Sequence, residues 1–153
     1  MIDIVQHIIN KSELIGWQSF VSKDNMVDYE LTLIDFTDGK DVLYMTLPTI
    51  KRKKDGEFYT NDIEFVFDLM LCRKFEQETF SNVAESPSEK YNNRLYELSN
   101  LLDAFLVNLS ISCTDHVLLD NTPFVLLTNK FSVSLDAVAT TITLTAWAQL
   151  PTT

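Results

Sequence analysis

The chain has 153 residues, of which 46% are hydrophobic and 22% charged, with only three glycines and four prolines. This composition excludes a disordered, collagen-like or linker-like chain, and the length predicts a single domain over residues 1–153. Acidic residues outnumber basic ones by 22 to 12, which gives a net charge of −10. That charge argues against a dedicated nucleic-acid-binding protein, because such proteins need positive charge against the phosphates.

The cysteines and the N-terminus carry no sign of secretion. Cys72 and Cys113 are too few for a disulfide framework, and no Cys and His cluster has the spacing of a zinc site. The first residues lack the basic and apolar regions of a signal peptide, and no stretch approaches the roughly 18 apolar residues of a membrane span. We therefore expect a chain made in the cytoplasm, with no membrane contact, metal or cofactor.

The N-terminal third predicts one short helix and two strands. Residues 2–14 place apolar side chains at helical spacing, and Gly16 supplies a stop. Residues 29–33 alternate between apolar and polar, a turn signal follows at residues 38–39, and residues 41–47 are predicted as the returning strand of a hairpin.

Residues 48–61 predict an exposed loop that carries the only basic cluster of the sequence. Such a cluster is either a solvated tip or a protrusion that docks on an acidic partner surface. We take its members as candidates for docking: Lys51, Arg52, Lys53 and Lys54.

The clearest strand covers residues 62–75, with apolar side chains at odd positions from Ile63 to Leu71. About fourteen residues is well beyond the usual length, and such strands tend to extend past their own domain. Glu64 and Asp68 fall on the opposite face, about 13 Å apart, which is too far for paired acid–base catalysis. A solvated face of an acidic sheet explains the pair better than a metal or catalytic role.

The best-specified element is a helix over residues 87–111. Ser86 is an N-cap residue, Pro87 fits the first helical position, and Glu89 completes a capping box. Leucines and aromatic residues then form one apolar stripe, so the helix is expected to lie across a sheet. The predicted fold class is α+β: a mostly antiparallel sheet with one long amphipathic helix packed on it and a short N-terminal helix.

The last third predicts strands over residues 116–119, 124–127, 131–137 and 142–149. The apolar parity switches from odd to even positions between Ala137 and Ile142, which predicts a bulge or kink there. Residues 131–153 contain a single charged side chain, Asp136, although exposed sheets are normally protected by Lys and Glu. Charge depletion of this kind is typical of the core of a subunit interface. The candidates for that interface are Thr143, Thr145, Trp147 and Gln149.

Catalytic patterns are scarce. The chain has two histidines, His7 and His116, and no nucleophile elbow, P-loop or dinucleotide-binding glycine motif. The Asp115-His116 pair could take part in catalysis only together with residues distant in sequence. A surface histidine in a turn is the better interpretation of this pair. We therefore expect no enzymatic activity.

The order of these elements resembles the tail-terminator and tail-completion proteins of tailed bacteriophages, and the related neck-ring proteins between portal and tail. The resemblance runs from the N-terminal helix through the long strand and long helix to the closing strands, over almost the whole chain. The family has no diagnostic short motif, so it assigns no individual residue. It implies a small α+β domain that forms a ring around the DNA channel, commonly a hexamer, and joins the tail tube to the head.

These patterns predict a structural virion protein, a ring-forming subunit of a phage head–tail connector that is made in the bacterial cytoplasm and located in the neck or tail. Its partners would be copies of itself, in a hexamer or larger ring, and other neck, tail or portal-associated proteins. DNA would pass through without specific binding, because an acidic wall repels it, and Glu64 and Asp68 are the candidates for this acidic channel lining. Two alternatives stay open: a monomeric small-ligand or regulatory binding module that uses the sheet face as its pocket, and a small enzyme based on Asp115-His116.

Overall fold

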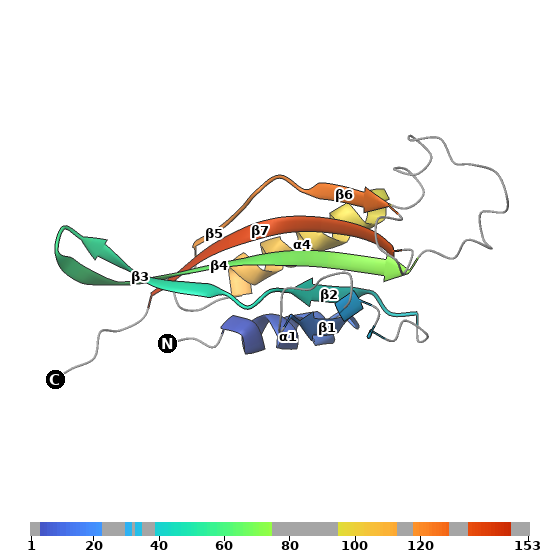
Figure 1. Ribbon diagram of the computed structural model, residues 1–153, viewed down its shortest axis with the longest axis horizontal. Coiled ribbons are helices and arrows are strands. Elements are labelled where there is room, and N and C mark those ends of the chain that lie inside the picture. The colour runs from blue at the N-terminus through green and yellow to red at the C-terminus, as the bar shows by residue number, and fades with distance from the viewer. Residues whose placement is uncertain are drawn as a thin grey trace, which may run out of the picture.

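The computed structural model describes residues 4–22, 30–31, 33–34, 39–74, 95–112, 118–128 and 135–147. Within them, seven strands form one mixed sheet in the order β1-β2-β4-β7-β5, with β3 paired to β4 and β6 paired to β7 (Figure 1). The strands are β1 (Gln18–Val21), β2 (Val42–Met45), β3 (Thr49–Asp55), β4 (Phe58–Lys74), β5 (Leu118–Asn121), β6 (Val125–Thr128) and β7 (Leu135–Trp147). The helices α1 (Ile4–Leu14) and α4 (Tyr96–Ser112) pack on one face of this sheet.

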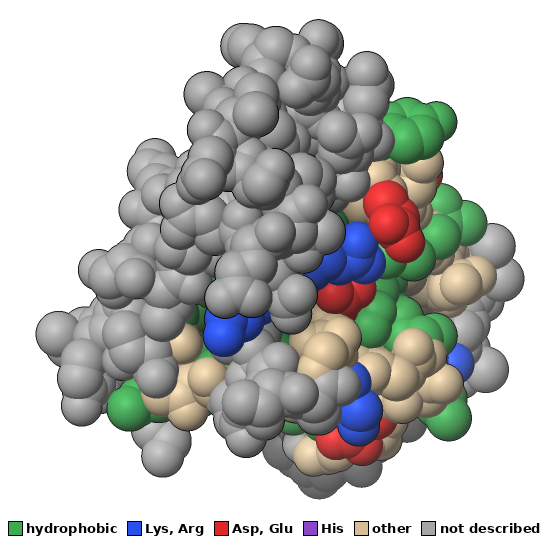
Figure 2. Space-filling view, turned by 90° about the vertical axis from the view of Figure 1, so that its right-hand side faces the viewer, with side chains coloured by type: hydrophobic (Ala, Val, Ile, Leu, Met, Phe, Trp, Pro, Cys, Tyr) green, Lys and Arg blue, Asp and Glu red, His purple; other side chains and the backbone are tan. Residues whose placement is uncertain are grey.

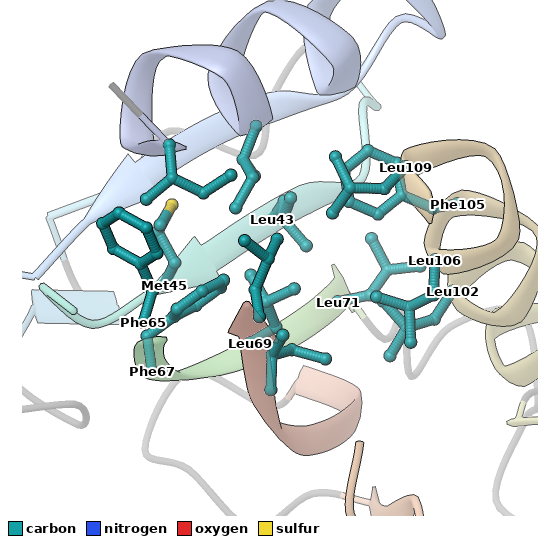
Figure 3. Packing of buried hydrophobic residues seen from close by; sticks show 14 of the residues in the cluster. Leu43, Met45, Phe65, Phe67, Leu69, Leu71, Leu102, Phe105, Leu106 and Leu109 are labelled. Atoms are coloured by element: carbon teal, nitrogen blue, oxygen red, sulfur yellow. The ribbon is translucent and has the colours of Figure 1, made fainter. Parts of the chain in front are cut away.

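Strands β4 and β7 form the centre of the sheet. They pair antiparallel in continuous register, from Asp62 opposite Trp147 to Lys74 opposite Leu135. Odd-numbered side chains of β4 from Ile63 to Leu71 are buried in the core beneath the helices, as the apolar alternation predicts. In Figure 3, Leu71 of β4 and Leu102 of α4 lie in this main core.

Helix α1 confirms the prediction for the N-terminus. Gly16 has a φ of 86°, a left-handed conformation that glycine adopts without strain and that commonly ends helices. The Gly16 amide donates to the Glu13 carbonyl, and the Trp17 amide donates to the Ser12 carbonyl, both at 3.0 Å. The Trp17 ring then packs on Phe105 of α4, with 5.2 Å between the ring centroids. Neither helix of the described segments is long and apolar enough to cross a lipid bilayer.

The structure contradicts the predicted fold class. The sheet dominates, and instead of one long helix lying across it, two helices share the cover of one face. Helix α4 covers the later part of the helix predicted over 87–111 and ends at Ser112, and Ser86, Pro87 and Glu89 lie outside the described residues. The sheet is mixed because β1 and β2 run parallel. Sequence patterns missed β1, which has only four residues, and β3, which is almost wholly polar.

The predicted hairpin of residues 29–33 and 41–47 is wrong in its first strand. Strand β2 lies within 41–47 as expected, but Glu30 and Leu31 are helical rather than extended. The partner of β2 is instead β1, which pairs with it from Gln18 opposite Val42 onward. Because β1 follows α1 directly, this pairing fixes α1 over the same edge of the sheet.

A second, smaller core lies on the face of the sheet that α1 and α4 leave free. Leu31 packs there against residues of β2, β4 and β7. Leu135 and Ala137 of β7 are buried in this second core, whereas Ile142 and Leu144 are buried in the main core. Val138 is buried in the main core as well, so β7 buries both faces at its start and only the main-core face from Ile142 onward. Its register with β4 stays continuous, and the predicted bulge between Ala137 and Ile142 is wrong.

Cys72 belongs to the second core and has no exposed surface. Burial, and to a lesser degree the Asp41 carboxylate, raise the pKa of its thiol to about 12. Because the thiolate is the reactive form, we expect Cys72 in a Cys113→Ser variant to react with iodoacetamide at neutral pH about a hundredfold more slowly in the folded protein than in denaturant. Mass spectrometry of quenched samples measures both rates, and similar rates would contradict this burial.

Candidate functional site

The face of the sheet opposite α1 and α4 carries most of the site residues predicted from the sequence. Strands β4 and β7 place alternate side chains on this face in register, because neighbouring antiparallel strands share their pleat. Outside the second core, these side chains are partly or fully exposed. We call this surface the open face, and its members on β4 and β7 are Glu64, Val66, Asp68, Thr141, Thr143 and Thr145.

Two sets of predicted residues meet on the open face. Glu64 and Asp68 were expected to line a channel, and Thr143 and Thr145 to contact a neighbouring subunit. The structure places Glu64 directly opposite Thr145. One surface cannot be covered by a neighbour and also line an open channel, so the two predicted roles compete for the same place.

The Asp68 carboxylate is held in position by its neighbours. The Thr141 hydroxyl donates to Asp68 Oδ1 at 2.7 Å. The Asp68 amide donates to Thr46 Oγ1 at 2.9 Å, which ties the middle of β4 to the residue after β2. Asp68 is nevertheless exposed, so its charge lies at the surface in a defined orientation.

Other predicted residues are described in part or not at all. Trp147 is the last residue of β7, and its backbone lies opposite Asp62 of β4. Gln149 and the Asp115-His116 pair lie outside the described residues. The described part of the predicted interface is therefore its threonine segment.

A groove of about 360 Å³ lies on the open face beside Asp68. Its walls are mostly apolar and include Met70 of β4, Val125 and Leu127 of β6, and Ala139 of β7. Val125 is 55% exposed, although it is a large apolar side chain. Of the described residues that line this groove, Asp68 carries the charge. We call it the sheet groove; no pattern in the sequence predicted it.

Strand β3 and the first part of β4 form a hairpin that projects beyond the rest of the sheet (Figure 1). Among the described residues, β7 pairs with β4 from Asp62 onward, and residues 58–61 extend about 13 Å past that point at roughly 3.3 Å per residue. The turn between Asp55 and Phe58 places Gly56 at a φ of 63°, which residues with side chains rarely adopt. The exposed loop predicted over 48–61 is therefore a two-stranded hairpin. We call residues 49–61 the hairpin arm.

The predicted docking residues all lie on β3: Lys51, Arg52, Lys53 and Lys54. Arg52 is partly buried, and its Nη1 donates to the carbonyl of Thr60 at 2.9 Å. The three lysines are exposed. Lys53 Nζ lies 3.6 Å from Glu64 Oε2, where the arm meets the open face. The positive charge is thus distributed along the hairpin arm.

The tip of the hairpin arm is aromatic. Phe58 is 80% exposed, and Tyr59 beside it is exposed as well. The Lys54 ammonium lies over the Tyr59 ring, 4.7 Å from its centroid, a cation–π contact that orders the lysine. Neither aromatic residue was predicted as a site residue, although two adjacent aromatics one residue after an Asp-Gly pair were a visible signal.

An ion-pair cluster ties three segments at the opposite end of the sheet. Arg73 of β4 donates Nε and Nη2 to the Asp41 carboxylate at 2.8 and 2.9 Å, and Nη1 to Glu97 of α4 at 3.1 Å. The bonds to Asp41, more than any other cause, raise the pKa of the guanidinium. Figure 2 views this end, where basic and acidic side chains lie among apolar ones. Because two carboxylates already occupy the guanidinium, the cluster acts as a structural tie.

Within the described segments, no three His, Cys, Asp or Glu side chains lie close enough together to hold a metal ion. Comparison of the sequence with known protein families and with curated proteins finds no match. A functional assignment therefore rests on the open face, the sheet groove and the hairpin arm.

Proposed function

We propose that the protein is a structural subunit of the head–tail connector of a tailed phage, which assembles with further copies of itself into a ring around the DNA channel. The observation that carries this proposal is a projecting hairpin arm with an exposed aromatic tip on the same sheet as a partly exposed, threonine-rich face. Exposed apolar side chains and faces poor in charge are typical of protein–protein contacts. The role is assembly rather than catalysis, at the neck or tail of the virion.

Strand β7 supports this proposal because it is almost free of charge. Asp136 is its one charged residue, and it is buried. A solvated sheet normally carries lysines and glutamates that oppose association with further chains. Thr143 and Thr145 lack such charges and are only partly exposed, so a neighbouring subunit covers them at a low desolvation cost. We place the subunit contact on this part of the open face.

The acidic balance supports a ring through which DNA moves. A net charge of −10 repels the phosphate backbone, so DNA slides past without adhering. Glu64 and Asp68 lie beside the threonines of the open face, and Glu64 already pairs with Lys53 of the hairpin arm. Their positions favour a role at the contact between copies, with the channel lined by other carboxylates.

A lysine at Thr143 tests the contact surface. We expect the wild type to associate with rising concentration into closed rings, and Thr143→Lys to weaken this association at least about tenfold, because the longer, charged side chain does not fit a contact made through small threonines. Sedimentation velocity measures the association, and negative-stain electron microscopy shows the rings. Asn100→Lys, which adds the same charge at an exposed position of α4, is the control and should assemble normally. Equal assembly of both variants would contradict a contact at Thr143.

The sheet groove favours one alternative, a monomeric binding module for a small apolar ligand. Its mostly apolar walls and single carboxylate are typical of a ligand site. The two functions predict different molecular masses in solution, because a binding module stays monomeric at every concentration. The module should also gain thermal stability when it binds an apolar cation such as a benzylamine. Concentration-dependent rings would exclude it.

A further inference from the structure

We infer that the hairpin arm of one copy seats in the sheet groove of a neighbouring copy. This inference rests on the proposed function, because it names the contact through which copies would join. Phe58 would enter the apolar part of the groove, and Lys53 and Lys54 would lie near Asp68 on its rim.

The charge distribution of the chain favours this contact. Residues 49–59 contain four of the 12 basic residues and two of the 22 acidic ones, so this segment carries +2 and the rest of the chain carries −12. A basic segment on a strongly acidic protein is attracted to the body of another copy. The groove presents the Asp68 carboxylate, and the described residues that line it include no Lys or Arg.

The two surfaces also match in polarity. The arm ends in Phe58, which is 80% exposed, and the groove contains Val125, which is 55% exposed. Each apolar surface costs free energy while it faces water, and burying one against the other recovers about 25 cal/mol for each Å² covered. An aromatic anchor in an apolar pocket, with charges at the rim, is the usual composition of an interface hot spot.

The arm cannot reach the groove of its own chain. Phe58 and Asp68 are ten residues apart on the same strand, so the extended backbone holds them about 33 Å apart. Pairing between β3 and β4 keeps the arm extended on both sides of its turn. An arm that seats in the groove must therefore come from a second copy.

The contact is heterologous, because it joins two different surfaces. Each copy would donate one arm and accept another, so the contact repeats from copy to copy. Such head-to-tail contacts produce rings when the rotation between copies closes and filaments when it does not. The contact therefore supplies a geometric route to the proposed ring.

Two variants with matched controls test the contact. Phe58→Ser removes the aromatic tip, and its control is Tyr96→Ser, an aromatic residue of α4 that is 53% exposed. Val125→Lys places an ammonium in the groove, and its control is Val107→Lys on α4, where the valine is 49% exposed. We expect each test variant to raise the dissociation constant for self-association at least about tenfold, and each control to stay near the wild-type value. Circular dichroism verifies folding, and Asp68→Asn is a second groove variant that keeps the shape of the side chain.

Mixing the two test variants gives the sharpest readout. Phe58→Ser retains an intact groove and Val125→Lys retains an intact arm, so together they make one productive contact. We expect sedimentation velocity to show one-to-one dimers in the mixture at a concentration where each variant alone is monomeric, with no larger species.

Other outcomes overturn the inference in distinguishable ways. If both variants form rings as the wild type does, the arm-in-groove contact is wrong while the proposed ring stands. If Phe58→Ser alone weakens assembly and the mixture is not rescued, the arm binds elsewhere and the inference is wrong. If the wild type is monomeric at every concentration tested, the inference and the proposed function both fail.

Discussion

Replacing Phe65 with alanine is expected to lower the free energy of unfolding by about 3–5 kcal/mol. Phe65 is 1% exposed and lies in the main core beside Phe67, Leu69 and Met45 (Figure 3). Truncation removes the ring from an apolar site and leaves a cavity, because the central strands β4 and β7 cannot close around the gap. Small domains are stable by only about 5–15 kcal/mol, so this loss is large. Urea titration followed by tryptophan fluorescence measures it.

Ile50→Ala is the matched control for this prediction. Ile50 lies directly opposite Phe65 in the pairing of β3 with β4, but it is 53% exposed. Because its side chain contributes little to the core, its truncation should cost less than about 1 kcal/mol. Comparable losses at the two positions would show that the covered face of β4 extends onto β3, contrary to the structure.

The long central strand was predictable because its signal is local. Odd-numbered apolar residues from Ile63 to Leu71 predicted both the strand and the face that it buries, and the main core contains them. The prediction began at residue 62, whereas β4 begins at Phe58. The first residues of β4 belong to the hairpin arm, where both faces are exposed and no apolar alternation marks a strand.

The fold class was not predictable from the same patterns. Hydrophobic periodicity reports burial, and β3 is exposed along most of its length, so its sequence has the composition of a loop. Strand β7 buries both faces near Leu135 and Val138 but only the main-core face from Ile142 onward, so a single strand had the pattern of two strands with a bulge between them. The second core that buries the additional face involves Leu31, which is distant in sequence. Contacts of that kind leave no local signal.

For the candidate site, the sequence predicted only which side chains share a face of each strand. Alternation along each strand correctly placed Glu64 on one face with Asp68, and Thr143 on one face with Thr145. The pairing of β4 with β7 then brought the two sets together, which no local pattern encodes. The sheet groove depends on Met70 and Val125, which come from strands far apart in sequence, so it is a product of the tertiary structure alone.

Replacing Arg73 with methionine is expected to cost about 2–3 kcal/mol, because it leaves the Asp41 carboxylate without its charged partner. The Asp41 side chain is largely buried and accepts both parallel hydrogen bonds from the guanidinium. Methionine retains most of the apolar volume of the arginine stem, so the loss reports the polar contacts. The third bond, to Glu97 on the exposed side of α4, contributes less because solvent screens it.

A double-mutant cycle separates these contributions. Asp41→Asn in the Arg73→Met background should cost little more than Arg73→Met alone, because the contact between the two side chains is already lost. Lys74→Met, at the exposed neighbouring residue of β4, changes the net charge equally and should alter stability by less than about 0.5 kcal/mol. If Arg73→Met were as stable as Lys74→Met, the ion-pair cluster would not hold β4 to Asp41 and α4. The position of α4 would then rest on its leucines in the main core.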